Sequence, residues 1–284
     1  MRDPSAPLGT FDAFRDVTAW NDETAQTWID ALNQRATSRD QRALRSLLLE
    51  LASLAPGDAA VEIGCGTGAL LCELAQIVGR EGRVVGFEPQ PLLAEAARQR
   101  VAAAGFAAIA AVECATAEQL PIDRDAVAAC LAQTVLIHLP DDVLRRVLME
   151  MARVVRPGGR VVSVDQDGDT WTIDHPDREL TRRIVRFNSD QRYADGWTRR
   201  RLRRLFRAAG LEAVDVRTLV HVDTEAESYL FGIAERIAGA AMDVGVIAVD
   251  EGRPWLDQLR RSAAQGDFFS SINYYIGVGL CGPR

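Results

Sequence analysis

Short apolar runs alternate with amphipathic stretches through the first 165 residues of the chain. The apolar runs have the length of buried strands and lie at 59–63, 83–88, 109–114, 127–133 and 159–165. Segments with helical spacing of apolar residues separate most of them, at 68–78, 91–103 and 142–155. Such alternation predicts an α/β fold, in which helices cover both faces of a parallel sheet. The ligand crevice of such a sheet lies outside the carboxyl ends of the strands, where the strand order reverses.

The flanking parts of the chain interrupt this alternation. Two helices are predicted before the first strand, at 22–34 and 39–54. Residues 166–197 are rich in aspartate and tryptophan, which predicts an insertion over the crevice with one helix at 179–192. The remaining predicted elements are helix 199–209, strand 214–222, helices 224–241 and 254–265, and strand 269–279.

These elements predict four parts of one enlarged domain. They are an N-terminal helical cap (1–54), a cofactor-binding αβ core (55–165), a lid insertion (166–197), and the C-terminal part of the core (198–284) with a helical insertion at 224–265. A chain of 284 residues with 48% hydrophobic residues can bury a core of this size.

Charge and composition narrow the possible partners. The net charge of −7 argues against nucleic acid or an anionic membrane as a partner, because binding phosphates requires clustered positive charge. The basic cluster Arg199–Arg207 has apolar residues at helical spacing, which predicts an amphipathic helix with a solvated arginine face. All 33 basic residues are arginine, so a mechanism based on a lysine Schiff base is excluded.

The five cysteines are scattered and lack the spacing of a zinc site, so we expect reduced thiols and no bound metal. The N-terminus has no apolar stretch of the kind found in signal peptides, and no segment offers 18 uninterrupted apolar residues. We therefore expect a cytoplasmic protein without a membrane partner, as a monomer or homodimer.

A glycine-rich turn follows the first predicted strand, where residues 61–68 read Val-Glu-Ile-Gly-Cys-Gly-Thr-Gly. Glycines let the backbone turn sharply and approach a ligand, and the free N–H groups of the next helix face polar groups of that ligand. Glu88 ends the second strand, where a carboxylate can accept hydrogen bonds from both hydroxyls of a ribose. The pattern predicts a nucleoside cofactor.

Two cofactor classes fit these glycines. Gly64-x-Gly66-x-x-Ala69 satisfies the dinucleotide fingerprint, which leaves an NAD(P) oxidoreductase open. The tighter pattern is an acid, Glu62, followed by Ile-Gly-x-Gly-Thr-Gly. With it, the chain resembles the class I S-adenosylmethionine-dependent methyltransferases, whose first motif has this form.

Three later segments carry the same resemblance. They are Leu120-Pro121-Ile122, His138-Leu139-Pro140-Asp141, and the Arg-Pro-Gly-Gly turn at 156–159. The chain looks most like the branch that contains the ubiquinone, menaquinone and many natural-product methyltransferases. The resemblance implies S-adenosylmethionine as cofactor and a Rossmann-like sheet of seven strands, the last two forming an antiparallel edge.

The resemblance also implies a set of cofactor contacts. Glu62 would hold the methionine ammonium, and Gly64, Gly66 and Gly68 would form the cradle. Further contacts are implied for Cys65, Glu88, Pro89, Thr116, Ala117 and Gln133. Thr116 and Ala128 depart from the family, which commonly has aspartate at both positions.

Methyl transfer requires mainly in-line placement of the acceptor and exclusion of water. His138 follows the fourth strand and is the candidate base, although it could equally cap the next helix or shape the pocket. Trp20, Trp171 and Tyr193 are candidates for an apolar acceptor pocket. The acidic run 165–169 lacks the glycine and glutamate of a calcium loop and is expected to be a solvated loop.

The leading hypothesis is methyl transfer to a small, apolar or aromatic metabolite of secondary or quinone-type metabolism. The first alternative is a methyltransferase-like protein that uses bound S-adenosylmethionine for a cyclisation without methyl transfer. An NAD(P) oxidoreductase is the second, and it leaves Glu62 and the Arg-Pro-Gly-Gly turn unexplained.

Overall fold

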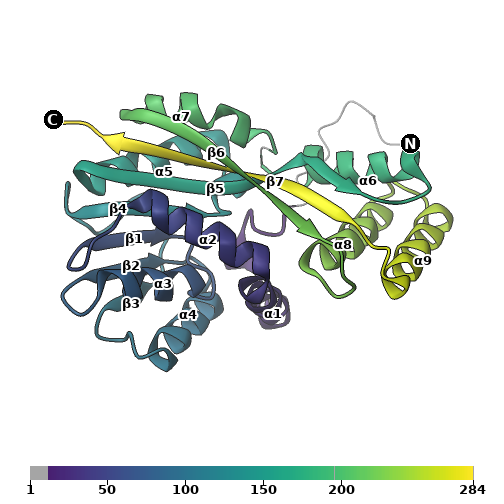
Figure 1. Ribbon diagram of the computed structural model, residues 1–284, viewed down its shortest axis with the longest axis horizontal. Helices are drawn as coiled ribbons and strands as arrows, with labels where there is room; N and C mark the ends of the chain where they lie inside the picture. The colour runs from purple at the N-terminus through teal and green to yellow at the C-terminus, as the bar shows by residue number, and fades with distance from the viewer. Residues whose placement is uncertain (1–11, 195, 284) are drawn as a thin grey trace.

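A seven-stranded sheet forms the centre of the molecule in the computed structural model, which describes residues 12–194 and 196–283 (Figure 1). Its order is β3-β2-β1-β4-β5-β7-β6. The strands are β1 (Ala59–Ile63), β2 (Arg83–Phe87), β3 (Ala110–Glu113), β4 (Val127–Gln133), β5 (Val155–Ile173), β6 (Leu211–Asp223) and β7 (Ser270–Cys281). Strands β1 to β5 pair in parallel, and β7 runs antiparallel between β5 and β6. This topology confirms the predicted fold.

Helices cover both faces of the sheet. They are α1 (Asp22–Thr37), α2 (Arg39–Ala52), α3 (Ala69–Val78), α4 (Pro91–Ala103), α5 (Asp141–Val154), α6 (Arg178–Gln191), α7 (Leu202–Ala208), α8 (Tyr229–Asp243) and α9 (Val249–Gln265). Successive strand residues point to opposite faces, so Val161 of β5 packs in the layer of α5 and α7, while Val162 packs in that of α2 and α3. The strand order reverses between β1 and β4, which places a ligand crevice at their carboxyl ends.

Most predicted elements are present with shifts of a few residues. Helix α4 and strand β4 occupy the residues predicted for them. Helix α9 begins five residues before Pro254, which the prediction took as its start. Its N-terminus is capped at Ala248, whose backbone N–H donates to Glu251 Oε2 at 3.0 Å. The first eleven residues of the predicted cap lie outside the described residues.

Strand β5 is longer than predicted, and the expectation of a solvated acidic loop at 165–169 is wrong. The strand continues to Ile173 because β7 pairs with it from Arg160 opposite Leu280 to Ile173 opposite Ser270, with a register shift after Asp167. Asp165 and Asp167 have no exposed surface. Local polarity suggested a loop, but pairing with a distant strand decides the conformation.

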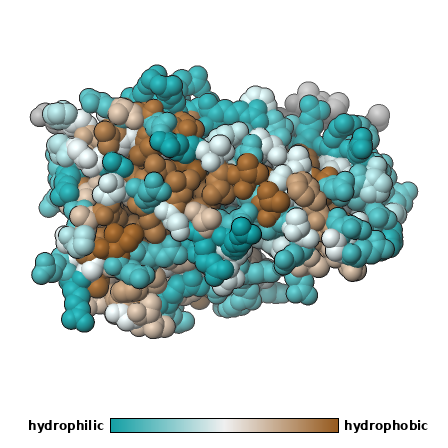
Figure 2. Space-filling model, in the orientation of Figure 1, coloured by the Kyte–Doolittle hydropathy of each residue, from teal (hydrophilic) through white to brown (hydrophobic). Residues whose placement is uncertain are grey.

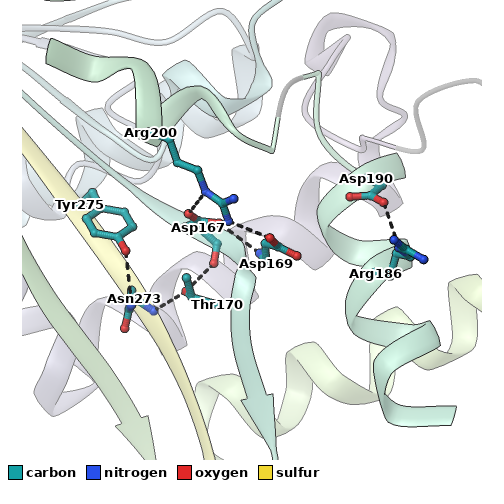
Figure 3. Close-up of polar contacts among 8 residues, drawn as sticks. All are labelled: Asp167, Asp169, Thr170, Arg186, Asp190, Arg200, Asn273 and Tyr275. Atoms are coloured by element: carbon teal, nitrogen blue, oxygen red, sulfur yellow. Dashed lines mark hydrogen bonds and ion pairs between the residues drawn. The ribbon is translucent and has the colours of Figure 1, made fainter. Parts of the chain in front are cut away.

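Arginines from the 3-10 helix η3 (Thr198–Arg201) neutralise this acidic stretch. Arg199 forms a buried ion pair with Asp165. Arg200 contacts Asp167 Oδ2 and Asp169 Oδ2, both at 2.8 Å, and joins η3 to β5 (Figure 3). The predicted solvated arginine face is therefore wrong for Arg199, which is 2% exposed. It holds for the exposed Arg203, Arg204 and Arg207.

The surface of the face shown in Figure 2 divides into two areas. Apolar residues gather over its left and middle parts, where Figure 1 shows the sheet and α2, while the α8 and α9 end is more polar. In the described part of the chain, no helix combines the length and the apolar character that a membrane span requires.

Candidate functional site: a cavity at the ends of β1, β2 and β4

A cavity of about 230 Å³ lies at the carboxyl ends of β1, β2 and β4. The glycine turn after β1, the residues after β2 and β4, helices α1 and α8, and the segment after α6 all contribute to its wall. It therefore occupies the crevice predicted from the strand order. The groups on its wall differ in chemistry from one part to another.

Glycine is required in the turn between β1 and α3. Gly64 and Gly66 have φ angles of +63° and +53°, a region that residues with a side chain rarely adopt. A Cβ atom on Gly64 would lie 2.5 Å from Cγ2 of Val135. The turn thus lines the cavity with backbone atoms that no side chain covers, so a bound nucleoside can contact them directly.

Glu88 follows β2 and faces this turn. Its Oε2 accepts the Gly66 N–H and its Oε1 accepts the Gln90 N–H, both at 3.0 Å. The side chain lines the cavity but is only 5% exposed, and burial raises the pKa of its carboxyl to about 7. Each carboxylate oxygen keeps a second acceptor position, so the group can also accept hydrogen bonds from a ligand.

Glu62 lies on β1 in front of the glycine turn and is 2% exposed. Its Oε2 is buried and has no hydrogen-bond partner in the described structure. Burial raises the pKa of this carboxyl well above its usual value, the Glu73 charge adds to the effect, and Arg45 opposes it. A ligand cation would relieve this cost. The group therefore fits the ammonium of a bound methionine moiety.

The predicted cofactor residues fall into two sets. Cys65, Pro89 and Gln133 line the cavity together with Glu62, Gly64, Gly66 and Glu88. Gly68, Thr116 and Ala117 are not among the lining residues. Gly68 is the N-cap of α3, and Thr116 is exposed.

The predicted acceptor residues also separate. Tyr193 lines the cavity, whereas Trp20 and Trp171 do not. Trp171 belongs to the extended β5, is 3% exposed, and donates its indole N–H to Ser270 Oγ at 2.9 Å. Trp20 stacks on Trp28, with ring centroids 6.0 Å apart, and Trp28 is the tryptophan that lines the cavity.

His138 lines the cavity beside an acidic partner that the sequence did not reveal. Its Nδ1 lies 2.8 Å from both carboxylate oxygens of Asp12, which is 9% exposed. The ring lies 4.9 Å from that of Phe14 and 5.7 Å from that of Tyr193. No local pattern links the two partners, because 126 positions separate them.

Four arginines on the cavity wall were also missed, and one of them, Arg45, is paired with Glu73. Arg35 of α1 donates from Nη1 to Thr134 Oγ1 at 2.8 Å and from Nε to Gln41 Oε1 at 3.0 Å, while its buried Nη2 has no partner. Arg192 follows α6, and Arg236 lies on α8. The helical periodicity of these segments assigns arginines to the solvent-exposed face. It therefore could not predict that these arginines line a cavity.

Comparisons with known proteins agree with this geometry. A family described as a methyltransferase domain matches residues 60–159, which span β1 to the start of β5. The demethylmenaquinone methyltransferase of Desulfitobacterium hafniense is 30% identical over 48% of this chain and 53% of its own length. The 2-phytyl-1,4-naphtoquinone methyltransferase of Synechococcus elongatus is 29% identical over 57% of this chain and 64% of its own length. The chain thus spans about half to two thirds of these curated methyltransferases.

A longer match covers most of the chain. An uncharacterized 37.1 kDa protein in transposon TN4556 of Streptomyces fradiae is 32% identical over 90% of this chain and 72% of its own length. That protein has no assigned activity, so it adds a relative but no chemistry.

Solved structures share the fold at low sequence identity. Phosphoethanolamine N-methyltransferase 2 of Haemonchus contortus, in complex with S-adenosyl-L-methionine, has a TM-score of 0.59 and 15% identity and covers 97% of this chain and 60% of its own. The [4+2]-cyclase SpnF has a TM-score of 0.53 and 17% identity and covers 88% of this chain and 85% of its own. The solved structures agree in fold, and the domain match and the curated relatives, together with the motifs, decide between the two cofactor classes: residues 60–159 form a class I methyltransferase domain, whose cofactor is S-adenosylmethionine.

Proposed function

We propose that the chain transfers the methyl group of S-adenosylmethionine to a small metabolite with an apolar or aromatic body. One observation supports this most directly: a single cavity joins the cofactor-side groups Glu62 and Glu88 to a wall that contains Trp28, Tyr193 and His138. Cofactor and acceptor would meet inside it. The similarity to quinone methyltransferases favours an acceptor of quinone type or a natural product of similar shape.

In this proposal the two acids hold opposite parts of the cofactor. Glu62 accepts hydrogen bonds from the methionine ammonium at its unpartnered Oε2, and Glu88 accepts them from the ribose hydroxyls. The free Nη2 of Arg35 is placed to bind the methionine carboxylate, since Arg35 is held next to the end of β4 by Thr134. Charged hydrogen bonds would then fix the orientation of the methionine part.

When bound, S-adenosylmethionine supplies an electrophilic methyl group on a sulfonium, and the protein has to place the acceptor in line with it. Where the acceptor atom carries a proton, His138 takes it at Nε2, because Nδ1 faces Asp12. Asp12 acts as a positioning residue that orients the ring and stabilises the imidazolium that forms. The aromatic side chains keep water from the reacting atoms.

Cyclisation with bound S-adenosylmethionine and no methyl transfer is the second candidate. The fold similarity to the [4+2]-cyclase SpnF is consistent with it. The two candidates differ in their products, because only methyl transfer converts the cofactor to S-adenosylhomocysteine in equal amount with a methylated product.

The experiment incubates the purified chain with S-adenosylmethionine carrying a labelled methyl group and a panel of naphthoquinols and related aromatic metabolites. We expect label in a product and one S-adenosylhomocysteine for each methyl group transferred. The Asp12→Asn variant should slow turnover while leaving cofactor affinity unchanged. Cofactor binding with a rearranged, unlabelled product would refute methyl transfer in favour of the cyclase, and an absence of cofactor binding would refute both.

A further inference from the structure

Of the four arginines on the cavity wall, Arg45 pairs with Glu73, while Arg35, Arg192 and Arg236 have no carboxylate partner among the described residues. Among the residues that the structure describes, neither Arg192 nor Arg236 forms an ion pair, and the buried Nε of Arg192 has no hydrogen-bond partner. The two buried arginines of the described chain do have such a partner, as Arg199 pairs with Asp165 and Arg45, on the same cavity wall, pairs with Glu73. Arg192 and Arg236 thus line the cavity without the carboxylate partner that Arg45 and Arg199 have.

The two guanidinium groups also influence each other. The pKa of Arg236 is lowered, mainly by burial, and the positive charge of Arg192 adds to that effect while Tyr229 and Glu235 oppose it. Two like charges on one cavity wall repel, and an anion that contacts both replaces this repulsion with attraction. Guanidinium groups present parallel N–H donors that match the paired oxygens of a carboxylate or phosphate.

The neighbours of these arginines are aromatic. The guanidinium carbon of Arg236 lies 5.8 Å from the centroid of the Trp28 ring. Tyr193 directly follows Arg192, and its ring lies 5.7 Å from that of His138. A ligand held by the arginines would therefore have its body among aromatic rings, close to the proposed base.

We propose that Arg192 and Arg236 bind an anionic oxygen group, a carboxylate or a phosphate, carried by the methyl acceptor. The acceptor is then an amphiphile, with an apolar or aromatic body between Trp28 and Tyr193 and an acidic group at the α6 and α8 side of the cavity. This inference rests on the proposed function, because it specifies the acceptor class for the same cavity. Arg35 takes no part in it, since its free donor is assigned to the cofactor.

The test measures binding of three matched probes to the full chain by calorimetry, in the presence of saturating S-adenosylhomocysteine. The probes are 2-naphthoate, 2-naphthyl phosphate and the neutral 2-naphthamide. We expect at least one acidic probe to bind about tenfold or more tightly than the amide, and added salt to weaken only the acidic probes. The acidic probe with the higher affinity identifies the group as carboxylate or phosphate.

Variants connect this preference to the two arginines. Arg192→Gln and Arg236→Gln should each reduce the preference for the acidic probe about tenfold, with unchanged affinity for S-adenosylhomocysteine and for the amide. Arg186→Gln is the matched control, because Arg186 lies on α6 with a side chain that is 82% exposed and paired with Asp190 (Figure 3). Arg236→Lys, which keeps the charge, should retain part of the preference if a glutamine variant fails to fold.

The outcomes separate this inference from the proposed function. S-adenosylhomocysteine binding without any preference for acidic probes, or a preference that survives in both glutamine variants, overturns the anion site and leaves the methyltransferase assignment intact. If S-adenosylhomocysteine itself does not bind, the proposed function fails first.

Discussion

The buried carboxyl of Glu88 makes the stability of the cofactor-free protein depend on pH in a way that can be calculated. Burial raises its pKa from an ordinary 4.5 to about 7, against the two backbone hydrogen bonds that favour ionisation. A raised pKa means that folding favours the neutral form. The stability associated with this form is fully present below pH 4.5 and is lost as the pH rises through about 7.

The magnitude follows from the size of the shift. The difference between 4.5 and about 7 corresponds to about 3 kcal/mol at 1.36 kcal/mol per pKa unit. Between pH 5 and pH 8 the free energy of unfolding falls by about 2.5 kcal/mol, because part of the total loss has already occurred at pH 5. Glu88→Gln keeps the shape of the side chain and removes its titration.

The assay is urea unfolding of the wild type and Glu88→Gln at pH values from 5 to 8, without cofactor. The free energy of unfolding of the wild type, relative to that of the variant, should fall by about 2.5 kcal/mol over this range. Titrating groups that do not interact with Glu88 are common to both proteins and cancel in the difference. Two curves that stay parallel would refute the assignment of a raised pKa to Glu88.

The remaining predictions concern three other positions. Glu62→Gln should weaken S-adenosylhomocysteine binding in calorimetry by about 2 kcal/mol, because an ammonium loses its buried charged acceptor; unchanged affinity would contradict this role. Asp12→Asn should lower kcat about tenfold or more without changing the KM for the cofactor, and a loss of cofactor affinity instead would mean a structural role. Gly64→Ala should lower the free energy of unfolding by about 2 kcal/mol or more, since it adds a clash with Val135 to an unfavourable φ. Gly266→Ala, in the left-handed region at φ +80° with open space around it, is the control and should cost less.

The sequence alone predicted those parts of the fold and of the site that depend on residues close together in the chain. The strand, glycine turn and helix at 59–78 form a local unit, so their pattern predicted both the turn and the acid at Glu62. Glu88 could be placed because it ends the next strand, and parallel strands direct their carboxyl ends to one edge of the sheet. The crevice therefore followed from periodicity and motif alone.

Contacts between distant segments could not be predicted in the same way. The extension of β5 depends on pairing with β7, about a hundred residues later, and it converted an apparent acidic loop into buried strand. It also removed Trp171 from the predicted pocket and placed it in the core. Asp12 meets His138 across 126 positions. The cavity arginines lie on, or directly after, helices whose amphipathic pattern resembles that of surface helices.

A crystal structure of the chain with S-adenosylhomocysteine tests the central claim most directly. The account predicts the amino group of the ligand within hydrogen-bond distance of Glu62, its ribose hydroxyls at Glu88, and its sulfur facing the part of the cavity that contains His138 and Tyr193. A ligand bound elsewhere, or in the cavity with its ribose away from Glu88 and its amino group away from Glu62, would contradict it.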